Sequence, residues 1–230
     1  MSDLHLCDLR NEGSPDDERL AKLARFICSS GAGAVLNLGD TISRKPFLRP
    51  EYASEREAFE VYLTWRSQFT IPFAECAVER EKEFFAGMMR QEPDSLMELP
   101  PDAAIITLLP GNTWRSFTSE QLEFLTAALE RSRGKTVVIG THVPFPGSCS
   151  REQDVFLQIP AHIMELLTNF PGKIIWCGGH FHWKNEPPAV SGSLAALYAS
   201  RFALKTLKDT SYTAMIDTAT GKITFDHHNF

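Results

Sequence analysis

The sequence predicts an α/β protein, and three observations support this fold class. Short apolar runs bounded by glycine are typical of buried strands. Segments with apolar residues at helical spacing lie between those runs along most of the chain. The C-terminal part instead holds short β-type runs joined by turn residues. Because strands that feed helices build open sheets, a ligand site is expected beyond the C-terminal ends of the strands.

Helices are expected in several segments of the chain. The first of them is closed by Gly31, a residue typical of helix C-termini. Thr118 and Gln121 have the T-x-x-Q form of a capping box, which predicts where a later helix begins. The expected helices cover residues 16–30, 51–68, 79–91, the segment between Thr118 and Gly134, and about 160–170.

Strands are expected where short apolar or β-type runs are flanked by turn residues. The turn at residues 218–221 is a hairpin signal between the last two runs. The stretch 92–101 contains proline and acidic residues and is expected to be a loop. The expected strands cover residues 33–38, 103–109, 135–140, 173–177, 194–200, 211–217 and 221–227.

Length and composition fit a single domain that covers residues 1–230. The net charge of -6 does not indicate nucleic-acid binding, which needs a clustered basic face. The 5 cysteines are an odd number without CxxC spacing, so a disulfide framework is a poor interpretation and a reducing cytoplasm fits better. We find neither an apolar run long enough for a membrane span nor a signal peptide. The oligomeric state is not predicted.

Aspartate and histidine residues stand where the predicted strands stop. Carboxylate oxygens and neutral imidazoles are the ligand types that Zn, Mn and Fe ions take in proteins. Two residues spaced i and i+2 point to the same side of an extended segment. The pair Asp3 and His5 and the pair His180 and His182 can therefore each offer two ligands. The candidate metal ligands are Asp3, His5, Asp40, His142, His180 and His182.

Each of these motifs has an ordinary structural interpretation when taken alone. Asp3 and His5 could be a surface aspartate beside a packed histidine, and Asp40 after glycine could belong to a turn. His142 could be a buried histidine with satisfied hydrogen bonds. Their joint occurrence at successive strand ends favours a shared metal site.

In order along the chain, SDLHL, LGD, GTHVP and GGHFH resemble the motifs of the calcineurin-like metallophosphoesterase superfamily. The resemblance runs from Asp3 to about His182. It implies a four-layer α/β/β/α sandwich of two mixed sheets flanked by helices, with a dinuclear metal site between loops. The ions implied are two divalent cations, Mn, Fe or Zn.

The resemblance also implies a role for each candidate ligand. One ion would be held by Asp3, His5, Asp40 and His182, and the other by Asp40, His142 and His180, with Asp40 bridging. Two such metals would clamp the phosphate oxygens of a monoester or diester and lower the pKa of a bridging water. The resulting hydroxide would attack phosphorus, so no protein nucleophile is needed.

The sequence departs from the family pattern at the G-N-H-D/E motif, which is absent. By its letters the best substitute is Asn112, a possible additional metal ligand, although its position is that of a later loop. By position the substitute would be Glu75, Cys76 or Glu79, unless these residues only begin a helix. With the motif gone, general acid help, typically worth about 10²–10⁴-fold, would have to come from elsewhere.

A second departure is at the N-terminus, where only Met1 and Ser2 precede Asp3. The family has a buried strand at this place. Either the start is misassigned or the first strand is missing, and a missing strand would leave Asp3 and His5 on a mobile end.

Other functional classes fit the sequence less well. A non-catalytic metal-binding scaffold that acts through a protein partner is favoured by the missing motif, but the Asp and His set argues against it. A zinc hydrolase of another type would need HxHxDH or HExxH, and a serine hydrolase would need GxSxG; none of these motifs is present.

Overall fold

The computed structural model describes residues 1, 3–9, 16–111, 113–148, 156–180, 189–198 and 211–228. In the last range, side chains are described for residues 215–224. The α-helices are α1 (Asp16–Ser30), α2 (Glu55–Arg66), α3 (Lys82–Phe84), α4 (Ser119–Arg131) and α5 (Ala161–Thr168). A 3-10 turn, η1 (Glu79–Glu81), and a π-type turn, η2 (Phe85–Met89), flank α3.

The main sheet has six strands in the order β3-β4-β5-β6-β8-β7. Its four central strands are parallel, and its two edge strands are antiparallel to their neighbours. The strands are β3 (Ser95–Leu99), β4 (Ala103–Thr107), β5 (Thr136–Gly140), β6 (Lys173–Gly178), β7 (Ala189–Ser191) and β8 (Leu194–Tyr198).

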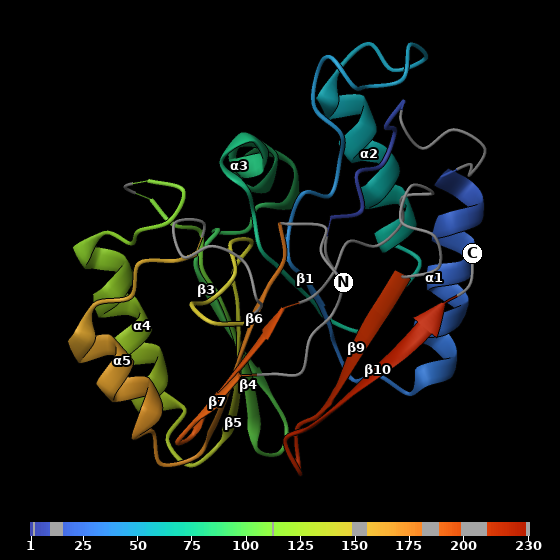
Figure 1. Ribbon diagram of the computed structural model, residues 1–230. Helices are drawn as coiled ribbons and strands as arrows, with labels where there is room; N and C mark the ends of the chain where they lie inside the picture. Colours follow the sequence, from blue (N-terminus) through green and yellow to red (C-terminus); the bar gives the residue numbers. More distant parts are fainter. Residues whose placement is uncertain are drawn as a thin grey trace.

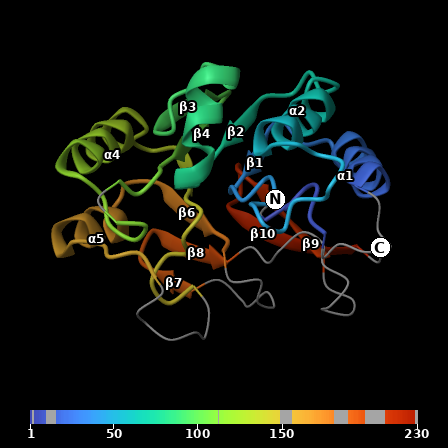
Figure 2. The same ribbon diagram turned by 90° about the horizontal axis from the view of Figure 1, so that it is seen from above.

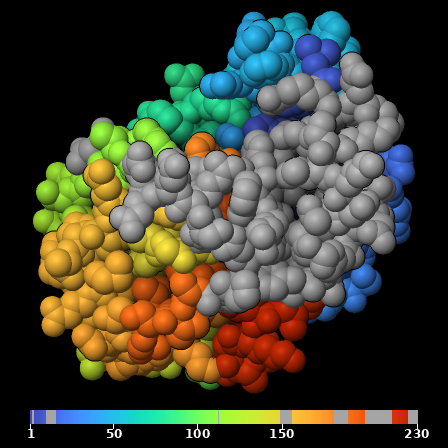
Figure 3. Space-filling view, in the orientation of Figure 1, coloured from blue at the N-terminus to red at the C-terminus, as the bar shows by residue number. Residues whose placement is uncertain are grey.

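A second β layer lies against one face of the main sheet. It contains the parallel pair β1 (Val35–Asn37) and β2 (Phe73–Glu75) and the antiparallel hairpin of β9 (Ser211–Asp217) and β10 (Lys222–His228). Helices α4 and α5 cover the outer face of the main sheet, while α1 and α2 lie on the opposite side of the molecule (Figures 1 and 2). The space-filling view shows the orange surface of the main sheet adjoining the red surface of the hairpin (Figure 3).

Alternation along the strands divides the core into three clusters. In β5, Val137 and Ile139 point to the cluster shared with α4 and α5, whereas Val138 points to the cluster between the two β layers. Val35 and Phe73 point from β1 and β2 to the third cluster, which packs on α1 and α2. Since strand side chains alternate between faces, three clusters separate four layers. The predicted α/β/β/α architecture is confirmed.

Two predictions of local structure were wrong. The stretch 92–101, expected to be a loop, contains β3, whose residues Leu96 and Met97 face opposite sides of the sheet. Prolines on both sides of this short strand hide its alternation in the sequence. The helix expected at 79–91 is broken into η1, α3 and η2, and it ends at Arg90 with φ 53. Gly87 within this segment lowers its helix propensity.

The first described residue already pairs with β1. The Met1 ammonium donates to the Leu36 carbonyl oxygen at 2.8 Å, and the Leu38 amide donates to the Met1 carbonyl oxygen at 2.9 Å. Among the described residues no strand precedes β1. A cavity of about 540 Å³ lies beside these residues, between the two β layers and α1. The described part of the chain has no helix long and apolar enough to cross a membrane.

Candidate metal centre

Five of the expected ligands lie together where strands of both β layers end; we call them the Asp/His cluster: Asp3, His5, Asp40, His142 and His180. His5 Nε2 lies 3.7 Å from Asp3 Oδ1 and 3.5 Å from Asp40 Oδ2. His142 Nε2 lies 3.6 Å from Asp40 Oδ2 and 3.0 Å from His180 Nδ1. The His180 amide donates to Asp3 Oδ2 at 3.1 Å, which closes the cluster.

The backbone of the cluster adopts left-handed conformations that side chains rarely take. The φ angles are 53 at Asp3, 42 at His5, 51 at Asp40 and 81 at His180. Such residues persist where the surrounding structure fixes them, and they concentrate at functional sites. Here the amides of Asp3 and His5 donate to the carbonyl oxygens of Gly39 and Asp40 at 2.9 and 3.0 Å. The two loops therefore hold each other in place.

Gly39 is required at the start of the second loop. Its φ is +88, and a Cβ there would lie 2.9 Å from the Cys76 carbonyl oxygen and 3.4 Å from His142 Nδ1. A larger residue would strain the backbone and push against the neighbouring strand end. The glycine thus lets Asp40 approach the histidine from the main sheet.

One nitrogen of His142 is held by a backbone carbonyl. Its Nδ1 lies 2.9 Å from the Leu38 carbonyl oxygen, so the proton is on Nδ1. The other nitrogen, Nε2, which faces Asp40 and His180, then carries the lone pair that can bind a metal. His142 and Asp3 are both buried, with 6% and 0% exposure.

The residues of the cluster fit a divalent cation. One ligand atom each of Asp3, Asp40 and His142 lie within 4.8 Å of one another. Two carboxylates and an imidazole are a donor set suited to Zn, Mn or Fe. His5 and His180 stand at the edges of the same group, and His180 also lies near a half-exposed aromatic side chain, Trp114, with ring centroids 5.5 Å apart.

Arg80 reaches the centre of the cluster from the segment that follows β2. Its Nη2 donates to Asp40 Oδ1 at 2.7 Å and to the Ile42 carbonyl oxygen at 2.8 Å. Nη1 is buried and has no hydrogen-bond partner among the described residues. The neighbouring Glu81 accepts from the amides of Thr41 and Ile42 at 2.7 and 3.3 Å, which fixes η1 against the loop after Asp40.

These charges shift the pKa values of two carboxyl groups. Burial alone would raise the pKa of Asp40, but His142 and Arg80 outweigh burial and lower the pKa below its ordinary value. Asp40 is therefore ionised at neutral pH. Burial raises the pKa of Glu81 to about 7, although the Arg80 charge opposes this.

The likeness to known proteins lies in the fold rather than in the sequence. No protein-family model and no curated protein matches the chain by sequence. Among solved structures, a dimetal phosphatase from Danio rerio is similar, with a TM-score of 0.66 and 11% identity. The match covers 87% of this chain and 86% of that one. The chain has the calcineurin-like metallophosphoesterase fold. The resemblance expected from the motifs is confirmed at the level of fold.

Two of the ligands expected from the sequence cannot be placed. His182 and Asn112 both lie outside the described residues. Nothing in the structure therefore relates either side chain to the cluster.

The residues at the end of β2 and after it that were expected to substitute for the G-N-H-D/E motif do not reach the cluster. Glu75 is fully buried away from the cluster, where it accepts from Tyr62 at 2.7 Å and from Asn37 at 2.9 Å and pairs with Arg66 at 2.8 Å. This network makes Glu75 a structural residue.

The other two positional candidates also point elsewhere. Cys76 Sγ packs 2.8 Å from the position that a Cβ on Gly140 would take, so the thiol faces the main sheet. Glu79 is exposed. What this segment brings to Asp40 is Arg80, which sequence reasoning missed. The only sequence signal was a charged run, Glu79–Glu81, just beyond the expected motif.

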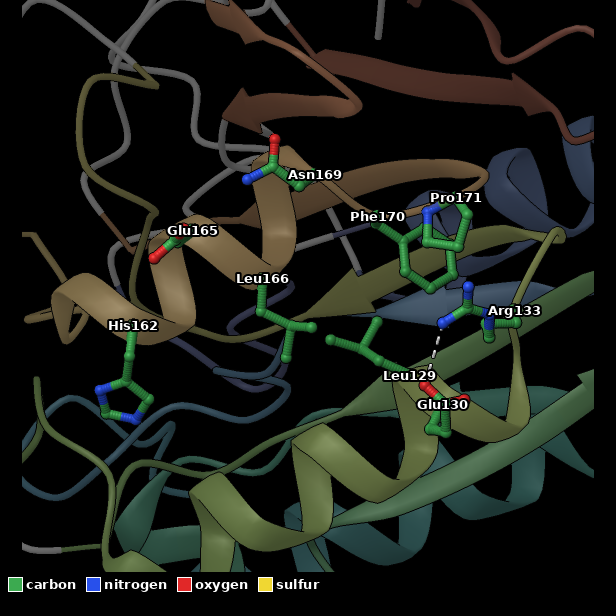
Figure 4. Close-up of a pocket in the computed structure, with 9 residues that line it drawn as sticks. All are labelled: Leu129, Glu130, Arg133, His162, Glu165, Leu166, Asn169, Phe170 and Pro171. Carbon is green, nitrogen blue, oxygen red and sulfur yellow. Dashed lines mark ion pairs between the residues drawn. The ribbon is translucent and has the colours of Figure 1, made fainter.

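A cavity of about 420 Å³ lies between α4 and α5, apart from the Asp/His cluster. Figure 4 shows Leu129 and Leu166 lining it, with Glu130 and Arg133 paired at 3.5 Å. His162 is its only histidine among the lining residues. No member of the Asp/His cluster lines this cavity, so it has no part in the candidate metal centre.

Proposed function

We propose that this chain is a metal-dependent hydrolase of phosphate esters, monoester or diester. The observation that carries the proposal is the Asp/His cluster, in which ligand atoms of Asp3, Asp40 and His142 lie within 4.8 Å of one another. The cluster stands in a fold shared with a dimetal phosphatase, which supports the same chemistry here. As expected from the sequence, we also propose that residues 1–230 form a single domain and that the protein works in the reducing cytoplasm.

The proposed ligands follow the family pattern. Asp3, His5 and Asp40, with His182, would hold one cation, and Asp40, His142 and His180 would hold the other. When bound, such cations polarise phosphate oxygens and lower the pKa of water, and this chemistry needs no protein nucleophile. The expected metals are Mn, Fe or Zn.

The chain's own residues prepare this site in three ways. The Leu38 carbonyl fixes the proton of His142 on Nδ1, so that Nε2 faces Asp40. Burial of Asp3 and His142 keeps water away from these side chains, so that water does not weaken their interaction with a cation. Arg80 offers Nη1, a donor that has no partner among the described residues, to an anionic group beside Asp40.

An aryl phosphate is a suitable first substrate because Trp114 presents aromatic surface beside His180. We expect Mn²⁺-loaded protein to hydrolyse an aryl phosphate monoester or diester and to stop when a chelator is added. His142→Ala should lower the rate by at least about 10²-fold, the scale of losing an electrostatic contact to the transition state. The ratio of diester to monoester rates then narrows the substrate class.

The matched control is His162→Ala, which removes an exposed histidine on α5 that is no part of the cluster. This variant should hydrolyse the substrate like the unchanged chain. Metal binding without turnover on any phosphate ester would favour the scaffold function instead, which the missing G-N-H-D/E motif already supports.

A further inference from the structure

The centre of the Asp/His cluster already holds a permanent positive charge. Arg80 Nη2 lies 2.7 Å from Asp40 Oδ1, and its side chain is only 23% exposed. A second bond to the Ile42 carbonyl at 2.8 Å fixes the guanidinium in that position. Because arginine is not deprotonated in proteins, this charge stays at every pH at which the chain is folded.

The contact involves the carboxylate that two cations would have to share. Asp40 Oδ2 faces both His5 and His142, at 3.5 and 3.6 Å, whereas Oδ1 is taken by Arg80. The guanidinium therefore neutralises part of the charge that would attract the two metals. It also stands beside any cation bound at Asp40 and repels it.

The segment that delivers Arg80 offers no compensating donor to a second cation. Val78 Cγ1 lies 3.3 Å from the position that a Cβ on Gly39 would take, so an aliphatic side chain fills the space next to the loop of Asp40. Cys76 faces the main sheet and Glu79 is exposed. After β2, where the family pattern has a metal ligand, this chain has the positively charged side chain of Arg80.

We infer that Arg80 takes the place of one of the two metal cations, so that the centre binds one divalent ion per chain. The guanidinium supplies the second positive charge beside Asp40. This inference rests on the proposed function for the identity of the cluster as a metal centre. It replaces the two-cation ligand set of the family pattern with a single metal ion, and Arg80 fixes this number.

Metal stoichiometry tests the inference directly. The unchanged chain is dialysed against Mn²⁺, and bound metal is counted by elemental analysis. We expect one Mn²⁺ per chain and a spectrum of isolated Mn²⁺ in electron paramagnetic resonance. In Arg80→Gln, the Kd for a second Mn²⁺ should be at least about tenfold lower than in the unchanged chain. The two bound ions should then give the signal of an exchange-coupled pair.

Two further variants control for charge and for folding. Arg80→Lys keeps the positive charge and should still bind one ion. Arg131→Gln removes the same charge from an ion pair of the same length, 2.7 Å to Glu98, on an exposed surface, and should also bind one ion. If Arg80→Gln does not fold, the count and the spectrum of the unchanged chain and of Arg80→Lys decide the question.

Two ions of similar affinity in the unchanged chain would overturn the inference, as would a folded Arg80→Gln that still binds one ion. Neither result touches the proposed function, which is judged by turnover. One bound ion without turnover, conversely, leaves the inference standing and removes the hydrolase proposal.

Discussion

Glu81 is a buried carboxyl group whose ionisation should make folding depend on pH. Its Oε1 accepts from the Thr41 amide at 2.7 Å, but its buried Oε2 has no hydrogen-bond partner among the described residues. Burial raises its pKa from 4.5 to about 7. The folded chain therefore holds this proton more tightly than the unfolded chain. The resulting stabilisation is fully present below pH 4.5 and is lost as the pH rises through about 7.

Glu81→Gln keeps an acceptor for the Thr41 amide and removes the titration. Between pH 5 and pH 8 the unfolding free energy of the unchanged chain should fall relative to that of the variant, by up to about 3 kcal/mol. Urea denaturation of both proteins in chelator, at several pH values, measures this difference. Parallel pH profiles would show that Glu81 ionises in the folded chain as easily as in the unfolded one.

Single residues of the candidate centre were predictable when they carried a motif. Asp40 and His142 each stand at the end of an apolar run, and parallel strand ends meet at one edge, whereas Asp3 was expected from its D-x-H spacing with His5. Arg80 carried no such signal. Its approach to Asp40 depends on a 3-10 turn that replaces the expected helix, and on Glu81 holding that turn. A contact made by an irregular turn is not encoded in periodicity.

At the scale of elements, α1 anchors the loop that carries Asp3 and His5. Arg19, only 2% exposed, donates through Nη2 to the Leu4 carbonyl oxygen at 2.6 Å. Asp16, the first residue of α1, accepts from Arg19 Nη1 at 2.9 Å and from the Cys7 amide at 2.7 Å. This buried ion pair joins the helix N-terminus to both sides of the loop.

Asp16→Asn should therefore loosen the candidate metal centre from a distance. The amide nitrogen of asparagine would face either Arg19 or the Cys7 amide, both donors, and the buried guanidinium would lose the negative charge 2.9 Å from its Nη1. We expect a loss of about 3–5 kcal/mol in unfolding free energy, measured by urea denaturation, together with weaker Mn²⁺ binding.

Glu18→Gln is the control within the same helical turn. Glu18 pairs with Lys22 at 3.0 Å, but both side chains are partly exposed, at 57% and 29%. A surface pair of this kind contributes little, so the change should stay within about 0.5 kcal/mol. Equal losses in the two variants would show that Asp16 does not anchor the loop.

Elements were predictable where periodicity was long and undisturbed. The first helix was expected at 16–30 and is found there, and the capping box of Thr118 and Gln121 begins α4 as expected. The errors fall on short or interrupted segments. Strand β3 is short and flanked by prolines, and the segment 79–91 combines a glycine with three kinds of turn, so neighbouring layers decide its conformation.

At the scale of the whole molecule, the Asp/His cluster draws on both β layers. Asp3, His5 and Asp40 belong to loops beside β1, whereas His142 and His180 follow β5 and β6 of the main sheet. A cation held by residues of both groups would bind only when the layers are packed together. Metal binding and packing of the layers should therefore be linked.

This linkage predicts that Mn²⁺ stabilises the whole fold. At a concentration about 100 times the Kd, a ligand that binds only the folded chain adds about 2.7 kcal/mol. For a chain of this size that corresponds to a rise in Tm of roughly 5–10 °C. Calorimetry with and without Mn²⁺ measures the shift, which His142→Ala should largely remove and His162→Ala should leave. Hydrogen exchange should slow on both sides of the cluster, near Asp40 and near His142. Protection confined to one layer would mean that the metal is held without joining the two sheets.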